Sequence, residues 1–196
     1  MLIDGQQVAV ITGAASGIGL GLVNICAARN IRIVAADISQ ARLESLSKDL
    51  QGRKIDHQIM VCDVSDPSQI KALADLAYSH YGQVNLLFNN AGIMINGLSW
   101  ECGIAEWQKT ININLMGAVY GIHEFVPRML MQASPAHIVN TSSLAGLLSS
   151  PMMAPYSASK HALVSLSESL LYDLQSQGSE IGVSVLCPAQ VDSNIM

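Results

Sequence analysis

Tyr156 and Lys160 lie four positions apart in the segment PYSASKHAL. If this segment is helical, both side chains lie on the same face, and a phenol and an ammonium are neighbours. A phenol has a pKa near ~10 in water, so it transfers protons poorly at neutral pH unless a nearby positive charge favours the phenolate. We therefore expect the Lys160 charge to lower the pKa of the Tyr156 phenol and to make it a proton donor and acceptor. The same four-residue spacing also occurs in helices without a catalytic role, so the surrounding motifs must show whether this pair is catalytic.

A glycine-rich turn, TGAASGIG at residues 12–19, follows the first strand-like run of the chain. Its glycines, Gly13, Gly17 and Gly19, allow the backbone to approach a ligand closely. The helix that follows directs free N–H groups and its positive dipole end at the same point, which favours a pyrophosphate. A tight turn without a ligand has the same composition, but Asp37 ends the second strand-like run about twenty residues on. That combination is the arrangement of dinucleotide-binding proteins.

The acidic residue at this strand end favours NAD over NADP. A carboxylate at Asp37 can accept hydrogen bonds from both hydroxyls of the adenosine ribose, and it would repel the extra phosphate of NADP. Ser16 adds no positive charge to the turn. NADP remains the less favoured alternative, because Arg42 is close in sequence and could offset Asp37, although we expect Arg42 on a solvated helix face.

Six short apolar runs alternate with helix-like stretches. The runs are QVAVIT, IRIVAAD, HQIMVCD, VNLLFNN, HIVNTSS and GVSVLCP, and the longer helices are expected over residues 66–82, from Ala105 to about Met131, and from Tyr156 to Gln177. Continuous apolar strands indicate a sheet covered on both faces. The alternation predicts an α/β fold with a doubly wound parallel sheet, a three-layer α/β/α Rossmann arrangement. Asp66 as N-cap, Pro67 at the first helical position and Gly82 at the C-terminal stop delimit one helix.

Composition predicts one compact domain over residues 1–196, since half of the residues are hydrophobic and only 13% are charged. The net charge of −5 gives no reason to expect nucleic acid or an anionic membrane as a partner. No apolar run approaches the ~20 residues of a membrane span and no export leader is recognisable, so we expect a cytoplasmic protein. The four scattered cysteines are interpreted as buried thiols, and neither they nor His123, His137 and His161 have metal-ligand spacing, so no metal site is expected.

Taken together, the motifs resemble the classical branch of the short-chain dehydrogenase/reductase superfamily over nearly the whole chain. TGAASGIG resembles its cofactor loop, CDV at 62–64 its adenine-contacting turn, and NNAG at 89–92 the motif ending its fourth strand. ININLMG with Asn114, SS at 142–143 and CPAQVDS near the chain end also match in order.

The resemblance implies roles for particular residues. Asn114, Ser143, Tyr156 and Lys160 would form the catalytic set, with Asn114 holding a water that relays protons towards Lys160. Successive side chains of a strand point to opposite faces, so only one of Ser142 and Ser143 reaches the site, and the family spacing selects Ser143. Serines after strands are also common turn formers, and Asp63 is also typical of a strand-end cap. The implied cofactor-binding residues are Gly13, Ser16, Gly17, Ile18, Gly19, Asp37, Asp63, Val64, Asn90, Ala91, Gly92, Tyr156, Lys160, Pro188 and Val191.

The resulting expectation is an oxidoreductase that moves a hydride between NAD and a secondary alcohol or ketone, with Tyr156 as general acid and base. An apolar substrate is favoured by the candidate pocket residues, which are Ile93, Met94, Ile95, Leu144, Leu148, Met152 and Met153. The alternatives are an NADPH-dependent ketoacyl-type reductase, a non-catalytic NAD-binding protein and, least favoured, an interaction module. The resemblance also implies a homodimer or homotetramer that packs through the long helices.

The sequence departs from the family pattern at two places. Ala189 replaces the usual glycine after Pro188, which is tolerated if its φ is negative. The sequence ends at Met196, before the lid and last strand that the resemblance implies. We expect a further tail rather than a shortened protein with an open substrate side.

Overall fold

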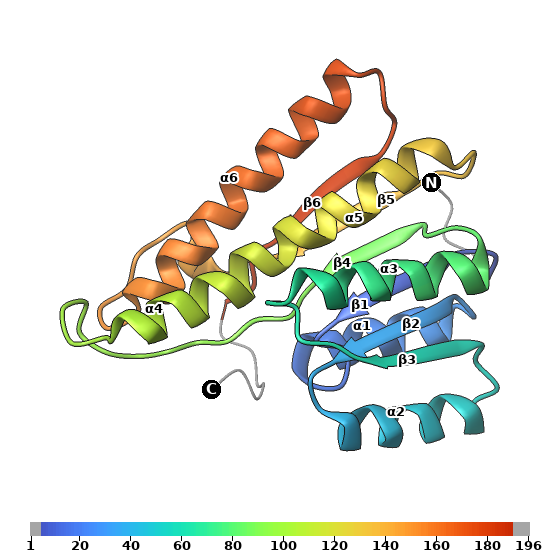
Figure 1. Cartoon of the computed structure of the whole chain (residues 1–196), viewed down its shortest axis with the longest axis horizontal. Coiled ribbons are helices and arrows are strands. Elements are labelled where there is room, and N and C mark those ends of the chain that lie inside the picture. Colours follow the sequence, from blue (N-terminus) through green and yellow to red (C-terminus); the bar gives the residue numbers. More distant parts are fainter. Residues whose placement is uncertain (1–4, 190–196) are drawn as a thin grey trace.

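The computed structural model describes residues 5–189 of the chain. Its six strands form one parallel sheet in the order β3-β2-β1-β4-β5-β6 (Figure 1). The strands are β1 Val8–Thr12, β2 Arg32–Asp37, β3 His57–Val61, β4 Leu86–Asn89, β5 His137–Thr141 and β6 Gly182–Leu186. The strand order reverses between β1 and β4, which is where ligands bind in open parallel sheets. The predicted doubly wound sheet is confirmed.

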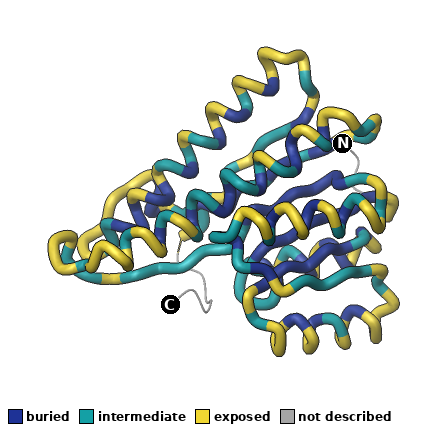
Figure 2. Tube along the Cα trace, in the orientation of Figure 1, coloured by how far each residue is buried: buried dark blue, intermediate teal, exposed yellow. Residues whose placement is uncertain are grey.

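Helices cover both faces of the sheet. One apolar core contains buried side chains of α3 (Pro67–Tyr81), α5 (Gly117–Met131) and α6 (Ala154–Ser176) together with strand residues. A second core joins α1 (Gly17–Ala28) and α2 (Gln40–Gly52) to the same sheet. Figure 2 shows the buried positions concentrated on the strands and on one side of each helix. β1 is buried at all five positions, as expected of a strand covered on both faces.

The helix predicted over residues 66–82 has the predicted boundaries. The Asp66 side chain accepts from the Ser68 amide, Pro67 occupies the first turn, and Gly82 ends the helix in the left-handed region with φ 72°. These three residues satisfy the free backbone groups at the ends of α3 and stop its growth. The local sequence is sufficient to define this element.

The long helical stretch predicted from Ala105 to Met131 contains an irregularity that the sequence did not predict. α4 (Ile104–Ile111) passes into a π-helical turn at Asn112–Met116 before α5 begins at Gly117. A π turn places one additional residue in a helical turn and shifts the phase of the side chains that follow. Here it contains Asn114, which is buried.

The interpretation of all four cysteines as buried thiols is half wrong. Cys26 and Cys62 are buried, and burial raises the pKa of each thiol to about 11. Cys102 and Cys187 are only partly buried, Cys102 in the turn before α4 and Cys187 in the segment after β6. Within residues 5–189 no group of three His, Cys, Asp or Glu side chains could hold a metal ion. None of the helices in this range is long and apolar enough to span a membrane.

Candidate active site

A cavity of about 560 Å³ opens at the carboxyl ends of the central strands. It is formed by the glycine turn after β1, the NNAG segment after β4, the residues after β5 and β6, and the first turns of α6. Most of the predicted site residues line it, namely Gly13, Ser16, Gly17, Ile18, Asn90, Ala91, Gly92, Ser143, Tyr156, Lys160 and Pro188. Gly19, Asp37, Asp63, Val64 and Asn114 do not line it, and Val191 lies outside the described residues.

The glycine turn has the geometry that close backbone approach requires. Gly13 has φ +62°, and a Cβ there would lie 2.9 Å from the Ala91 Cα atom. A Cβ on Gly19 would overlap the Gly13 carbonyl and come within 2.7 Å of the Asn90 amide nitrogen. α1 begins at Gly17, and its N-cap residue Ser16 makes no side-chain capping hydrogen bond. The turn thus directs helix N–H groups towards the cavity without side-chain cover, which fits a pyrophosphate.

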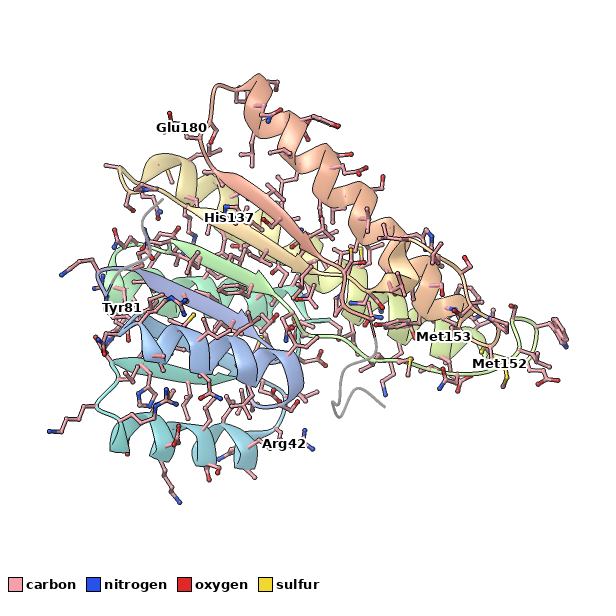
Figure 3. All side chains as sticks on the ribbon, turned by 180° about the vertical axis from the view of Figure 1, so that it is seen from behind. Arg42, Tyr81, His137, Met152, Met153 and Glu180 are labelled. Carbon is pink, nitrogen blue, oxygen red and sulfur yellow. The ribbon has the colours of Figure 1, made fainter. Side chains whose placement is uncertain are left out.

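Asp37 ties this turn to the neighbouring strand. Its two carboxylate oxygens accept hydrogen bonds from the backbone amides of Ala15 and Ser39, at 3.0 Å each. Each oxygen retains a second lone pair, so the carboxylate can still accept ribose hydroxyls. Arg42 is exposed in the first turn of α2, as expected (Figure 3).

The segment after β3 has a structural role. One Asp63 carboxylate oxygen accepts from both the amide and the hydroxyl of Ser65, at 2.9 and 2.7 Å. The Asp63 amide donates to the Gln69 side chain at 2.8 Å. Val64 is buried in the core that contains α3 and α5. The structure therefore supports the interpretation of Asp63 as a strand-end cap, and an adenine contact at these two residues stays a prediction.

Lys160 is almost completely buried beside Tyr156. Its ammonium donates a 2.7 Å hydrogen bond to the Thr141 carbonyl and lies 5.7 Å from the centre of the Tyr156 ring. Burial lowers the pKa of Lys160 to about 8, because an ammonium loses hydration in an apolar surrounding. The helix thus brings the two side chains together as the four-residue spacing predicts.

The expectation that Lys160 lowers the pKa of the phenol is wrong for this structure. Burial raises the pKa of Tyr156, and only the Ser143 side chain opposes that change. The physical reason is that the same dry pocket disfavours the charged form of both groups. Moreover, the ammonium lies over the ring face and bonds to a backbone carbonyl.

Both serines after β5 line the cavity, so the expectation that only one of them reaches it is wrong, although their side chains have different partners. Ser143 lines the cavity, and its oxygen also accepts from the Ala145 amide at 3.1 Å in a short 3-10 turn, Leu144–Gly146. Ser142 is buried and donates a 2.9 Å hydrogen bond to the Lys160 carbonyl. Ser143 therefore forms the turn and also lies beside the Tyr156 phenol in the cavity.

Asn114 acts as a tether in this structure. Its amide oxygen accepts from the Ile93 N–H at 2.8 Å, and its nitrogen donates to the Ile93 carbonyl and to the Ser159 hydroxyl, at 2.9 and 3.0 Å. A Cβ on Gly92 would lie 3.3 Å from the Asn114 oxygen and 3.4 Å from the Lys160 ammonium. Asn114 and Lys160 therefore both approach the cavity wall at Gly92, and the proton relay through a water stays a prediction.

Sequence reasoning missed Thr12, which joins the two backbone segments of the site. Its hydroxyl oxygen accepts from the amides of Asn90 and Ala91, at 3.0 and 3.1 Å, and donates to the Phe88 carbonyl. Asn90 returns a 3.0 Å hydrogen bond to the Thr12 carbonyl, so its amide ties the ends of β1 and β4 together. The available signal was that Thr12 is the first residue of the TGAASGIG motif.

The remaining wall of the cavity is mostly apolar. Met94, Leu144, Leu148 and Met153 line it as expected, with Ser150 as an added hydroxyl. Ile93, Ile95 and Met152 do not, which corrects the expected set. Met152 has φ +60°, and its carbonyl accepts from the Gly97 amide, so the chain turns it outwards (Figure 3). Ala189 is not among the described residues with positive φ, so its methyl group is tolerated.

Comparisons with known proteins agree with this geometry. A family model described as short chain dehydrogenase matches residues 7–196. The chain is 37% identical over 191 residues to a C alpha-dehydrogenase of Sphingobium sp., covering 97% of this chain and 62% of that protein. It is 35% identical to the 1-deoxy-11-beta-hydroxypentalenate dehydrogenase of Streptomyces avermitilis, covering 94% and 68%.

A solved structure is also very similar. A short chain dehydrogenase/reductase from Burkholderia phymatum in complex with NAD superposes with a TM-score of 0.97 at 44% identity, covering 100% of this chain and 69% of that one. The chain spans about two thirds of the length of the relatives it matches.

Proposed function

The chain belongs to the short-chain dehydrogenase family, and we propose that it is an NAD-dependent oxidoreductase that acts on a neutral, apolar secondary alcohol or its ketone. The observation that supports this most strongly is the convergence of Ser143, Tyr156 and Lys160 on the cavity that the glycine turn also lines. A hydroxyl, a phenol and an ammonium on one wall suit proton transfer to and from an alcohol oxygen.

The residues present fit a dinucleotide. Gly13, Gly17 and Gly92 have no side chains, so the dinucleotide could lie directly against the main chain at this wall of the cavity. The start of α1 would bind its pyrophosphate. We propose that Asp37 accepts the adenosine ribose hydroxyls and that Lys160 binds the nicotinamide ribose. When bound, the oxidised nicotinamide ring would accept the hydride and add a positive charge near the phenol.

In the oxidative direction Tyr156 would take the hydroxyl proton of the substrate, and in the reductive direction it would return that proton to the carbonyl oxygen. Ser143 would donate a hydrogen bond to the same oxygen and stabilise its developing charge. Because burial raises the pKa of the phenol in this structure, we propose that proton release from Tyr156 becomes favourable only in the complex with oxidised cofactor.

The cavity wall supports a neutral substrate. Lys160 alone is charged among the described residues that line it, and its ammonium is bonded to Thr141. Among the described residues the substrate side is built mainly from Met94, Leu144, Leu148 and Met153, with the Ser150 hydroxyl beside them, so it offers no cation to a carboxylate or phosphate. We therefore propose that anionic alcohols are poor substrates.

The experiment is a panel of neutral and carboxylated secondary alcohols, assayed for reduced nicotinamide with NAD and separately with NADP. We expect turnover with NAD and a neutral apolar alcohol. Nucleotide binding without turnover on any alcohol or ketone would indicate a non-catalytic NAD-binding protein. A preference for the phosphorylated cofactor would support the ketoacyl-type reductase, with exposed Arg42 as the cation near Asp37.

We also propose that the protein acts in the cytoplasm as a homodimer or homotetramer that packs through α4, α5 and α6. Exposed apolar side chains on these helices support that arrangement, namely Ile104, Leu130, Met131 and Tyr172. Light scattering after size-exclusion chromatography tests the assembly, and a monomer at micromolar concentration would contradict it.

A further inference from the structure

Helix α6 contains two buried serines with the same hydrogen-bonding arrangement. Ser159 donates to the Tyr156 carbonyl at 2.7 Å, and Ser167 donates to the Leu163 carbonyl at 2.7 Å. Each also accepts a hydrogen bond from a buried asparagine amide outside the helix, Asn114 for Ser159 at 3.0 Å and Asn140 for Ser167 at 2.8 Å. A buried hydroxyl bonded on both sides fixes the helix relative to the element that supplies the amide.

The Ser159 arrangement ends at the main chain of Tyr156. Asn114, which supplies the amide, is itself held by both backbone groups of Ile93, next to the cavity wall at Gly92. A continuous set of hydrogen bonds therefore joins the segment after β4, the π-helical turn and the Tyr156 carbonyl. Ser159 is fully buried and does not line the cavity, so it acts only through its neighbours.

The start of α6 requires such an attachment. The helix begins at Ala154, so Tyr156 lies in its first turn, where helices fray. The N-cap residue Met153 makes no side-chain capping hydrogen bond, and Met152 before it has φ +60°. The first turn is thus held at its N-terminal side by backbone contacts and at the Tyr156 carbonyl by the bond from Ser159, while Lys160 is tied to Ser142 and Thr141 further along the helix.

We propose that Ser159 is a positioning residue for Tyr156: its hydroxyl fastens the first turn of α6 to Asn114 and so sets the place of the phenol relative to the cofactor wall at Gly92. This proposal rests on the proposed function, because it assigns Ser159 to the proton transfer at Tyr156. A misplacement of about 1 Å at a reacting group can reduce the rate about a hundredfold.

Ser167 provides a matched control. It is equally buried, makes the same two kinds of hydrogen bond, and its partner Asn140 is held by the Asn89 amide at 2.8 Å. It lies eleven residues beyond Tyr156, about 16 Å along the helix axis, and does not line the cavity. Ser167→Ala therefore removes an equivalent pair of bonds from the same helix at a distance from the phenol.

The experiment compares Ser159→Ala and Ser167→Ala with the wild type in three measurements. The first is Tm, and the second is the pH profile of kcat/KM with the best alcohol of the panel and NAD. The third is the NMR signal of the Tyr156 ring carbon bonded to oxygen, with and without NAD, in protein labelled at its five tyrosines. The variant Tyr156→Phe assigns that signal.

We expect both alanine variants to lower Tm by similar amounts. Only Ser159→Ala should reduce kcat/KM by about tenfold to a hundredfold, displace the pH profile and change the Tyr156 signal in the NAD complex. Equal effects of the two variants on the profile and the signal, or no effect of either, would overturn the proposal. If Ser159→Ala does not fold, Ser159→Cys takes its place, since a thiol of similar size is a weaker donor and should give a smaller effect of the same kind.

The NMR measurement separates this proposal from the proposed function. If the wild type oxidises no alcohol, the proposed function fails, whereas a Tyr156 signal that differs only in Ser159→Ala would still support positioning by Ser159. If the wild type is active and the signal and the pH profile are the same in both variants, the positioning role fails alone.

Discussion

Replacing Lys160 by methionine should change how the stability of the protein depends on pH. Lys160 is 2% exposed, and burial lowers its pKa from an ordinary value of 10.5 to about 8. Between these two values the unfolded chain binds more protons than the folded one, so the folded state gains stability as pH rises. The penalty for burying the ammonium is fully present below pH 8 and disappears above about 10.5.

The size of the effect follows from the two pKa values. A tenfold change in proton affinity is worth about 1.4 kcal/mol, so the buried ammonium destabilises the fold by about 3 kcal/mol at neutral pH. Methionine has a similar unbranched shape and no charge, but it leaves the Thr141 carbonyl without its 2.7 Å hydrogen bond. That loss costs about 1–3 kcal/mol and does not depend on pH. The variant should therefore be as stable as the wild type or up to about 2 kcal/mol more stable at pH 7.

Urea denaturation of both proteins at intervals from pH 7 to pH 10 tests this reasoning. The difference in free energy of unfolding between variant and wild type should fall steadily above pH 8, towards a total change of about 3 kcal/mol. Titration of the buried thiols occurs in both proteins and cancels in the difference. Lys48→Met, at an exposed position of α2, controls for the loss of one positive charge. A difference that is independent of pH would refute a buried, weakly basic Lys160.

Two further predictions concern the cofactor wall. Gly19→Ala should abolish NAD affinity and lower Tm, because its Cβ would overlap the Gly13 carbonyl. Gly21→Ala in the same helix meets no atom within 4 Å and should raise the free energy of unfolding by up to ~1 kcal/mol. Calorimetry measures stability and NAD binding of both variants, and equal NAD affinity in the two would contradict the role of Gly19. Asp37→Asn should weaken NAD more than NADP, because it removes the charge that disfavours the extra phosphate; unchanged selectivity in measured dissociation constants would contradict the NAD assignment.

The elements of the fold could be predicted because their signals are local. The apolar strand runs, the α3 caps at Asp66 and Gly82 and the left-handed Gly13 each follow from neighbouring residues. The π-helical turn at Asn112–Met116 could not, since the partners of its buried Asn114 are Ile93 and Ser159, which are 21 and 45 residues away. Long-range hydrogen bonds of this kind leave no periodic pattern in the sequence.

The side chains of the site could be chosen from motifs, but their electrostatics could not. The spacing of Tyr156 and Lys160 predicts that they are neighbours, but it does not predict how far the two side chains are buried from solvent. Burial lowers the pKa of the lysine and raises the pKa of the phenol, against the sequence-based expectation for Tyr156. The paired role of Asn140 and Ser167 was missed for a similar reason, because each looks like an isolated polar residue in an apolar segment.

The central claim is that Tyr156 mediates proton transfer while hydride passes between an alcohol and NAD. The most direct measurement uses a neutral secondary alcohol with deuterium on its carbinol carbon and follows the isotope into the reduced cofactor by mass spectrometry. We predict that the wild type forms deuterated NADH and that Tyr156→Phe, which keeps the fold and NAD binding, forms almost none. Deuterium transfer by Tyr156→Phe at the wild-type rate would contradict the account.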